Sequence, residues 1–140
     1  MRQHYSLSLF LFIAILTACT NVTSYHTRDG ALINLGNIVI IHNVADDQHL
    51  ENQIRDSLQQ RGFKAVAERA HNIPSDADTL FYYVPYWVEV EHNHTLHIHV
   101  HDARTHQLLA SATSSRSLFQ STNPRDIVNR TLDTLFSPND

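Results

Sequence analysis

Histidine is the residue type in this 140-residue chain whose number and spacing point to chemistry. Six of the eleven histidines lie within fifteen residues, and three of them, His97, His99 and His101, alternate with apolar residues. On a β-strand, side chains two residues apart share one face and are about 6.6 Å apart, so a His-x-His pair can direct two imidazoles at one ion. Zinc or copper(II) is the metal that such ligands predict.

A third ligand for this site could come from the preceding strand. If the valines before the turn share the buried face with Ile98, the hairpin register places Glu89 opposite His97 and Trp87 opposite His99. Imidazoles are also tolerated on the solvent-facing side of a sheet, and the sequence places no hydrogen-bond partner behind the rings. We therefore expect solvated histidines first, with a metal site formed by these histidines and Glu89 as the alternative.

The single cysteine is the second residue with a chemical role. It follows a leader in which Arg2 precedes an apolar run at residues 7–16, too short for a hydrocarbon core that needs about 20 residues. Leu16-Thr17-Ala18-Cys19 resembles the lipobox of bacterial lipoproteins, whose cysteine is acylated and becomes the N-terminus. Residues 1–18 are thus expected to be a signal peptide and Cys19 the lipid attachment site. An ordinary secreted protein is the alternative.

The lipoprotein resemblance also implies a compartment. Inner-membrane lipoproteins of enterobacterial type carry aspartate directly after the cysteine, whereas Thr20 stands here, which implies the outer membrane, facing the periplasm. Without the leader the chain has nine Lys and Arg against fourteen Asp and Glu, so it offers no basic field to nucleic acid. The expected partners are the membrane, through the lipid, and another envelope protein.

A polar stretch separates the leader from the part expected to fold. Residues 20–35 show neither a helical nor a strand period, so residues 19–36 are predicted to be the lipidated N-terminus and a flexible tether. A single domain is expected over residues 37–140. One cysteine cannot form an internal disulfide, so packing alone must stabilise this domain.

Five strands and two helices are expected in the domain. Apolar residues recur every four positions from Leu50 to Leu58 and predict a helix that Asp46 or Asp47 caps, while Asn123-Pro124 begins a second helix. Strands are predicted at residues 37–42, 63–68, 79–91, 95–101 and 107–117. The predicted fold is α+β, a mostly antiparallel sheet of about five strands with both helices on one face, in the order β-α-β-β-β-β-α.

Three segments resemble a group of small Gram-negative outer-membrane lipoproteins of unknown function. They are IRDSLQQRGF at 54–63, Asp76-Ala77-Asp78 before the aromatic strand, and LHIHVHDARTHQLLASA at 96–112. The order of elements is also distantly similar to the TolB N-terminal domain and to curli-export lipoproteins of the CsgG type. In those relatives a turn reads Asp-Ala-x-Thr-Gly, and here His106 replaces the glycine. The resemblance implies a fold and a compartment, and it carries no catalytic residue.

Nothing in the sequence points to an enzyme. Three glycines cannot supply a phosphate-binding loop, and the acidic pairs fit helix caps and turns. The aromatic strand could instead expose Tyr86 and Trp87 as a protein-docking patch. We expect a non-catalytic accessory module that binds protein and needs no cofactor, with periplasmic zinc or copper binding through the histidine hairpin as the alternative.

Overall fold

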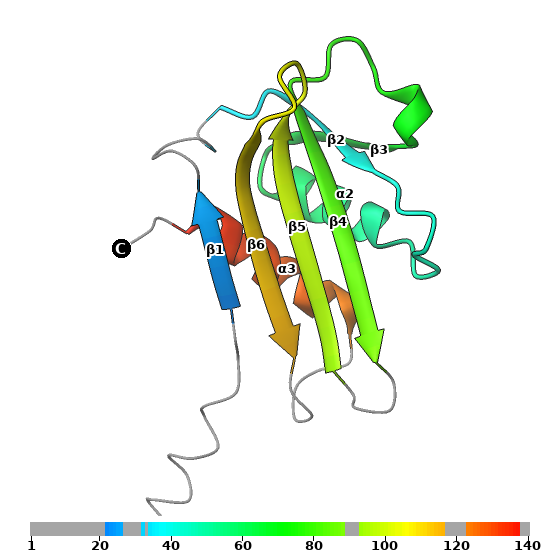
Figure 1. Cartoon of the computed structure of the whole chain (residues 1–140), viewed down its shortest axis with the longest axis vertical. Helices are drawn as coiled ribbons and strands as arrows, with labels where there is room; N and C mark the ends of the chain where they lie inside the picture. The colour runs from blue at the N-terminus through cyan, green and yellow to red at the C-terminus, as the bar shows by residue number, and fades with distance from the viewer. Residues whose placement is uncertain (1–21, 27–31, 33, 89–92, 117–122, 138–140) are drawn as a thin grey trace, which may run out of the picture.

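Six strands form one mixed sheet in the computed structural model, which describes residues 22–26, 32, 34–88, 93–116 and 123–137 (Figure 1). The spatial order is β1-β6-β5-β4-β2-β3. β2 runs parallel to both β3 and β4, and the other three pairings are antiparallel. The strands are β1 (Val22–His26), β2 (Asn37–Ile41), β3 (Lys64–Glu68), β4 (Thr79–Val88), β5 (Asn93–Asp102) and β6 (Leu108–Arg116).

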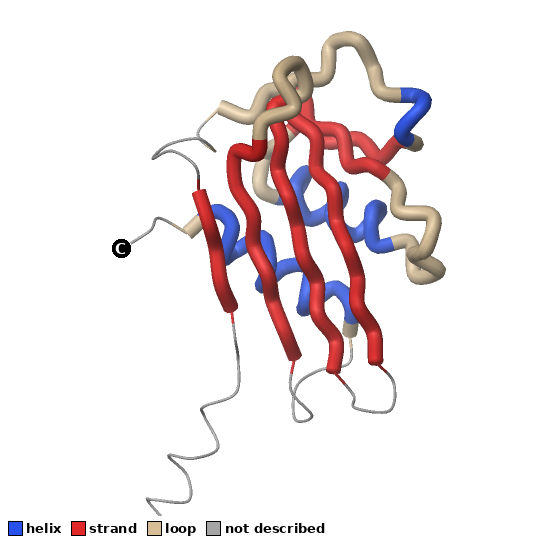
Figure 2. The backbone as a smooth tube through the Cα atoms, viewed as in Figure 1, coloured by secondary structure: helices blue, strands red, loops and turns tan. Residues whose placement is uncertain are grey.

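Two helices cover the same face of this sheet (Figure 2). α2 (Leu50–Gln60) connects the parallel strands β2 and β3, and α3 (Pro124–Phe136) follows β6 and packs on β6, β5 and β1. Pro124 fits the first turn of α3, where the side chain of Asn123 accepts a hydrogen bond from the Arg125 amide at 3.0 Å. A 3-10 turn, η1 (Ala70–Asn72), lies between β3 and β4. Within the described ranges, no helix has the length and apolarity needed to cross a bilayer.

The core lies between the sheet and the two helices. Leu58 and Ile54 of α2 are fully buried, as their four-residue spacing predicts, and so are Ile98 and Val100 of β5. The alternating strand pattern places His97, His99 and His101 of β5 on the opposite face. The strongest sequence patterns therefore correspond to the surfaces that are buried.

The α+β class and the placement of both helices on one face agree with the sequence-based expectation, but the sheet differs from it. The structure contains a sixth strand, β1, within the stretch for which the sequence predicts a tether. β1 pairs with β6, and Nε2 of His26 lies 2.8 Å from the carbonyl oxygen of Leu135 in α3. Backbone hydrogen bonds to a strand far away in the sequence hold this short polar segment in the sheet. Its sequence therefore contains no apolar pattern that would predict a strand. The sheet is mixed because β2 pairs in parallel with both of its neighbours, β3 and β4.

Candidate functional site

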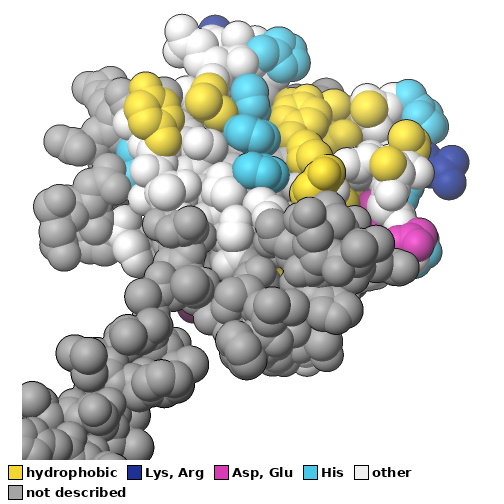
Figure 3. Space-filling view, turned by 60° about the horizontal axis from the view of Figure 1, so that its bottom comes forward, with side chains coloured by type: hydrophobic (Ala, Val, Ile, Leu, Met, Phe, Trp, Pro, Cys, Tyr) yellow, Lys and Arg dark blue, Asp and Glu magenta, His cyan; other side chains and the backbone are white. Residues whose placement is uncertain are grey.

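One side of the sheet faces away from both helices, and its exposed part over β1, β6, β5 and β4 is here called the open face. Two rows of paired residues cross it: Tyr25, Ser111, His99 and Tyr82, and next to them Thr23, Thr113, His97 and Val84. Figure 3 shows a column of histidine side chains with hydrophobic groups on either side of it. Tyr25, Val84 and Tyr86 are 58%, 48% and 60% exposed, so this face carries apolar surface in contact with solvent.

The hairpin register on the open face differs from the expected one. Val84 lies opposite His97 and Tyr82 opposite His99, so the expectation that Glu89 and Trp87 occupy these places is wrong. The cause is the core, because Phe81 pairs with Val100 and keeps its aromatic ring on the buried face. Glu89 lies outside the described residues.

The histidines of β5 have partners that the sequence did not indicate. Nδ1 of His97 lies 2.9 Å from Oγ1 of Thr113, and Nδ1 of His101 lies 3.1 Å from the carbonyl oxygen of His106. Burial, and next the neighbouring charges of His97 and His101, lower the pKa of His99. The three rings form an ordered, half-buried column, and within the described ranges they join no group of three metal-ligand atoms close enough to share an ion.

The other predicted site residues are only partly described. The backbone of Trp87 lies in β4 opposite His94, next to the exposed Tyr86. Cys19 lies outside the described residues. Val22, the first residue of β1, follows it by three positions. The predicted docking patch is therefore represented by Tyr86, and the lipid site stays a prediction.

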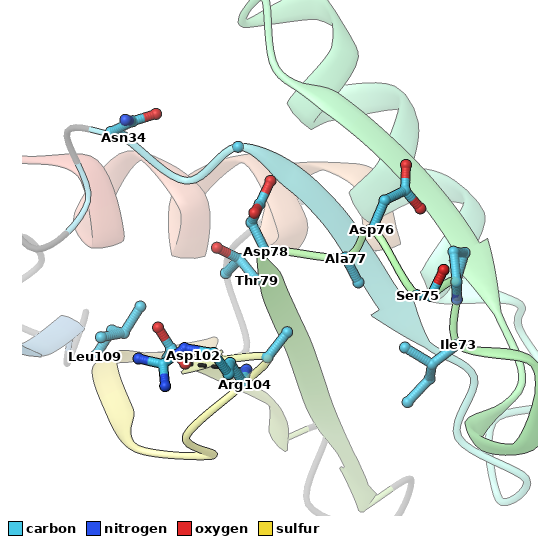
Figure 4. A pocket seen from close by; sticks show the side chains of 13 residues that line it. Asn34, Ile73, Ser75, Asp76, Ala77, Asp78, Thr79, Asp102, Arg104 and Leu109 are labelled. Carbon is cyan, nitrogen blue, oxygen red and sulfur yellow. Dashed lines mark hydrogen bonds between the residues drawn. The ribbon is translucent and has the colours of Figure 1, made fainter.

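A hollow of about 810 Å³ opens where the loops before β4 and after β5 meet (Figure 4). Its carboxylates already have local partners. Oδ2 of Asp78 accepts the amide of Asn37 at 2.8 Å, and Oδ1 of Asp102 accepts the amides of Arg104 and Thr105. The bond from the Thr105 amide is the main reason that the pKa of Asp102 is lowered. Asp102 thus stabilises the turn after β5, whereas Asp78 ties the start of β4 to the start of β2.

A second cluster lies at the end of β2 and the start of α2, and sequence reasoning missed it. His42, His49 and Glu51 each present a ligand atom, and these atoms lie within 4.8 Å of one another. Nδ1 of His42 and Nδ1 of His49 are each 3.3 Å from the same oxygen, Oε1 of Glu51. The only sequence signal is a histidine directly after a strand and a glutamate in the first turn of the next helix.

Two buried groups hold this cluster in place. The hydroxyl of Tyr83 lies 2.9 Å from Oε2 of Glu51 and 2.9 Å from Oδ2 of Asp46. Asp46 accepts the amide of Leu50 at 2.6 Å and that of Gln48 at 2.9 Å, so it fixes the loop that leads into α2. The N-cap residue of α2 is His49, so the prediction that Asp46 or Asp47 occupies this position is wrong, although Asp46 accepts the first amide of the helix from three residues before the cap.

The same contacts set the ionisation of the two inner groups. Burial raises the pKa of Glu51, but hydrogen bonds from Tyr83 and His49 and the charge of His42 outweigh it, and the net pKa is lowered. Burial is the first cause that raises the pKa of Tyr83, and the facing Glu51 and Asp46 carboxylates raise it further. At neutral pH the cluster therefore holds an ionised Glu51 and a neutral phenol.

No protein-family model and no curated protein matches this sequence. Solved structures with a similar fold include two of the PelC dodecamer from Paraburkholderia phytofirmans, both with a TM-score of 0.62. One of them, a point variant, is 15% identical in sequence, and the match covers 82% of this chain and 99% of the PelC chain. The other is 13% identical, and the match covers 86% of this chain and 100% of the PelC chain. A PDZ domain protein from Parabacteroides distasonis has a TM-score of 0.50 and 9% identity, over 83% of this chain and 35% of that one. At these identities the likeness shows a shared fold alone.

Proposed function

We propose that this chain is a lipid-anchored, non-catalytic protein of the cell envelope that assembles with copies of itself through the open face. The observation that carries the proposal is an ordered sheet face with exposed Tyr25, Val84 and Tyr86 around the histidine column. Exposed apolar side chains gathered on one face of a folded domain are typical of an interaction site.

The composition of the open face suits contact with an identical surface. Its two rows consist of Tyr, Val, Ser, Thr and His side chains, so they carry no formal charge when the histidines are neutral. Two copies can therefore meet without like-charge repulsion, and aromatic residues with few charged ones are typical of an interface core. The PelC structures, whose chains this fold covers almost completely, are dodecamers. A second copy is accordingly the partner that we infer.

The lipid anchor at Cys19 would set the orientation of this assembly. Val22 follows Cys19 by three positions, an extended reach of about 10 Å. Acylation would hold the end of the sheet where β1 begins close to the outer membrane, on its periplasmic side. A short connection of this kind gives each copy the same orientation on the membrane, which favours lateral assembly.

The assembly is tested by measuring the mass of the full chain purified in detergent. Val84→Asp places a charge on the open face beside the histidine column and should convert the oligomer to a monomer, because burying an unpaired carboxylate is unfavourable. Val44→Asp, the same change at a fully exposed loop position, is the matched control and should leave the mass unchanged. A monomeric wild-type chain, or a Val84→Asp variant that assembles normally, would overturn self-assembly.

The anchor is tested separately through Cys19→Ala. We expect this variant to take up no labelled fatty acid and to leave the membrane fraction, because Cys19 is the single thiol of the sequence to which the lipid could be attached. If the alanine variant still carries the label, the lipoprotein assignment is wrong, and the assembly proposal is unaffected.

A further inference from the structure

We propose that His42, His49 and Glu51 form a binding site for one divalent transition-metal ion of the zinc class. The three residues come from the end of β2, the residue before α2 and the first turn of α2. Their ligand atoms already lie within 4.8 Å of one another. Two imidazoles and one carboxylate are ligands that zinc and copper(II) accept, whereas calcium and magnesium require oxygen.

The distances match those of a metal site. In tetrahedral zinc centres with bonds of about 2.0 to 2.1 Å, neighbouring ligand atoms are separated by about 3.3 Å. Nδ1 of His42 and Nδ1 of His49 lie 3.3 Å from Oε1 of Glu51. The distance between the two imidazole nitrogens can shorten by rotation of the His49 side chain, which is 66% exposed. One ion can therefore replace the shared contact without a change in the backbone.

The groups behind Glu51 orient it as the second layer of a metal site does. Tyr83 holds Oε2 at 2.9 Å and leaves Oε1 directed at the two histidines. A phenol carries a single hydrogen, yet this one also lies 2.9 Å from Oδ2 of Asp46. Two buried carboxylates therefore share one donor, and a cation on Glu51 offsets the negative charge between them.

The backbone of His49 supplies an independent observation. Its φ of 54° and ψ of 47° lie in the left-handed region, which is less favourable than a right-handed conformation for a residue with a Cβ. Glycine or asparagine would adopt this conformation at lower cost. A strained residue at the point where three ligand groups converge indicates that its side chain has a function.

The site opens on a pocket of about 420 Å³, so a three-ligand centre would keep one position accessible. Glu68 adds a further carboxylate to the wall of this pocket. Arg55 and Arg69 also line the pocket, and the guanidinium of Arg55 is bound to Asp56 at 2.7 Å and to Asn52 at 2.8 Å. The charge of Arg55 is thus partly offset before an ion arrives.

The experiment titrates zinc chloride into the untagged full chain in detergent, followed by calorimetry and thermal unfolding. The wild type should bind one ion per chain in this site and gain in melting temperature, since only the folded form holds the ligands together. Glu51→Gln and His49→Gly should each weaken this binding at least tenfold. His49→Gly should also raise the melting temperature without zinc, because glycine relieves the left-handed strain.

Two control variants distinguish zinc bound at this cluster from zinc bound by the histidines of the open face. The double variant His97→Gln with His99→Gln, on the open face, should bind zinc at the cluster as the wild type does. Tyr83→Phe keeps the ring and should weaken binding about 10-fold to 100-fold, because Glu51 loses its orienting bond. The proposal is overturned if the wild type binds no zinc, if Glu51→Gln or His49→Gly binds it as tightly, or if the open-face variant loses it. Each outcome is independent of the assembly proposed above.

Discussion

Replacement of Gly36 by alanine tests the junction at which the chain enters the sheet. Gly36 has a φ of 59° and precedes β2, and an added Cβ would overlap Oδ2 of Asp78 and lie 2.7 Å from the Cβ of that residue. Contacts this short require Asp78 to move, and the bond that Oδ2 accepts from the Asn37 amide at 2.8 Å would then be lost. Gly62, two residues after the end of α2, has a φ of 88° and nothing within 4 Å of an added Cβ. Substitution by alanine therefore carries the same backbone cost at both glycines, and only the substitution at Gly36 adds a steric clash.

The magnitudes follow from these two contributions. A left-handed conformation costs alanine about 1 to 2 kcal/mol in the folded state. Alanine also lowers the conformational entropy of the unfolded chain, which offsets part of this cost, so Gly62→Ala should lose about 1 kcal/mol of stability. Gly36→Ala adds the lost bond to an exposed carboxylate, about 1 kcal/mol, and should lose about 2 kcal/mol in total. Urea unfolding followed by circular dichroism measures both values.

A second background isolates the clash. Asp78→Gly removes the three atoms that an added Cβ at Gly36 would meet, so in this background Gly36→Ala should cost only its backbone contribution. If Gly36→Ala and Gly62→Ala lose the same stability within about 0.5 kcal/mol, or if the Asp78→Gly background changes nothing, the added Cβ meets no steric clash at Gly36.

Three further predictions concern the core, the β5–β6 turn and the histidine column. Leu58→Ala should cost about 2 to 5 kcal/mol, since Leu58 is fully buried, and a loss below about 0.5 kcal/mol in denaturant titration would contradict its place in the core. His106 has a φ of 58°, so His106→Gly should raise stability by about 1 kcal/mol, and an unchanged melting temperature would refute the strain. Because the folded chain lowers the pKa of His99 below 6.5, the unfolded chain binds more protons, and stability should fall as pH decreases through 6.5. His99→Gln should make melting temperature less dependent on pH in that range, and an identical pH profile would count against the lowered pKa.

Local patterns were sufficient for the elements of this fold that bury apolar surface. The four-residue spacing from Leu50 to Leu58 and the Asn123-Pro124 start predicted α2 and α3 close to their observed bounds. Alternation in β5 correctly separated a buried face from a face that carries histidines. His106, which stands where the similar lipoproteins carry glycine, adopts a positive φ, the conformation that glycine adopts most readily. Burial and local backbone geometry act over a few residues, so a sequence records them directly.

Long-range pairing was decided by the tertiary structure. β1 is a short polar strand whose stability comes from hydrogen bonds to β6, almost ninety residues further along the chain, and such bonds require no particular side chains. A shift in hairpin register exchanged the predicted partner Glu89 for Val84 opposite His97, because the sheet aligned Phe81 with Val100 in the core.

The composition and periodicity of this sequence were sufficient to predict an acidic α+β domain with two helices. The leader could be compared with a lipoprotein signal from its sequence alone. Only the folded chain brought Tyr83 of β4 to Glu51 of α2, and through it set His42 and His49 around one carboxylate oxygen. Sequence periodicity specifies which face of each element is buried, since that choice depends on neighbours within one or two turns. The convergence of side chains from separate elements depends on how those elements pack, and no local pattern encodes it.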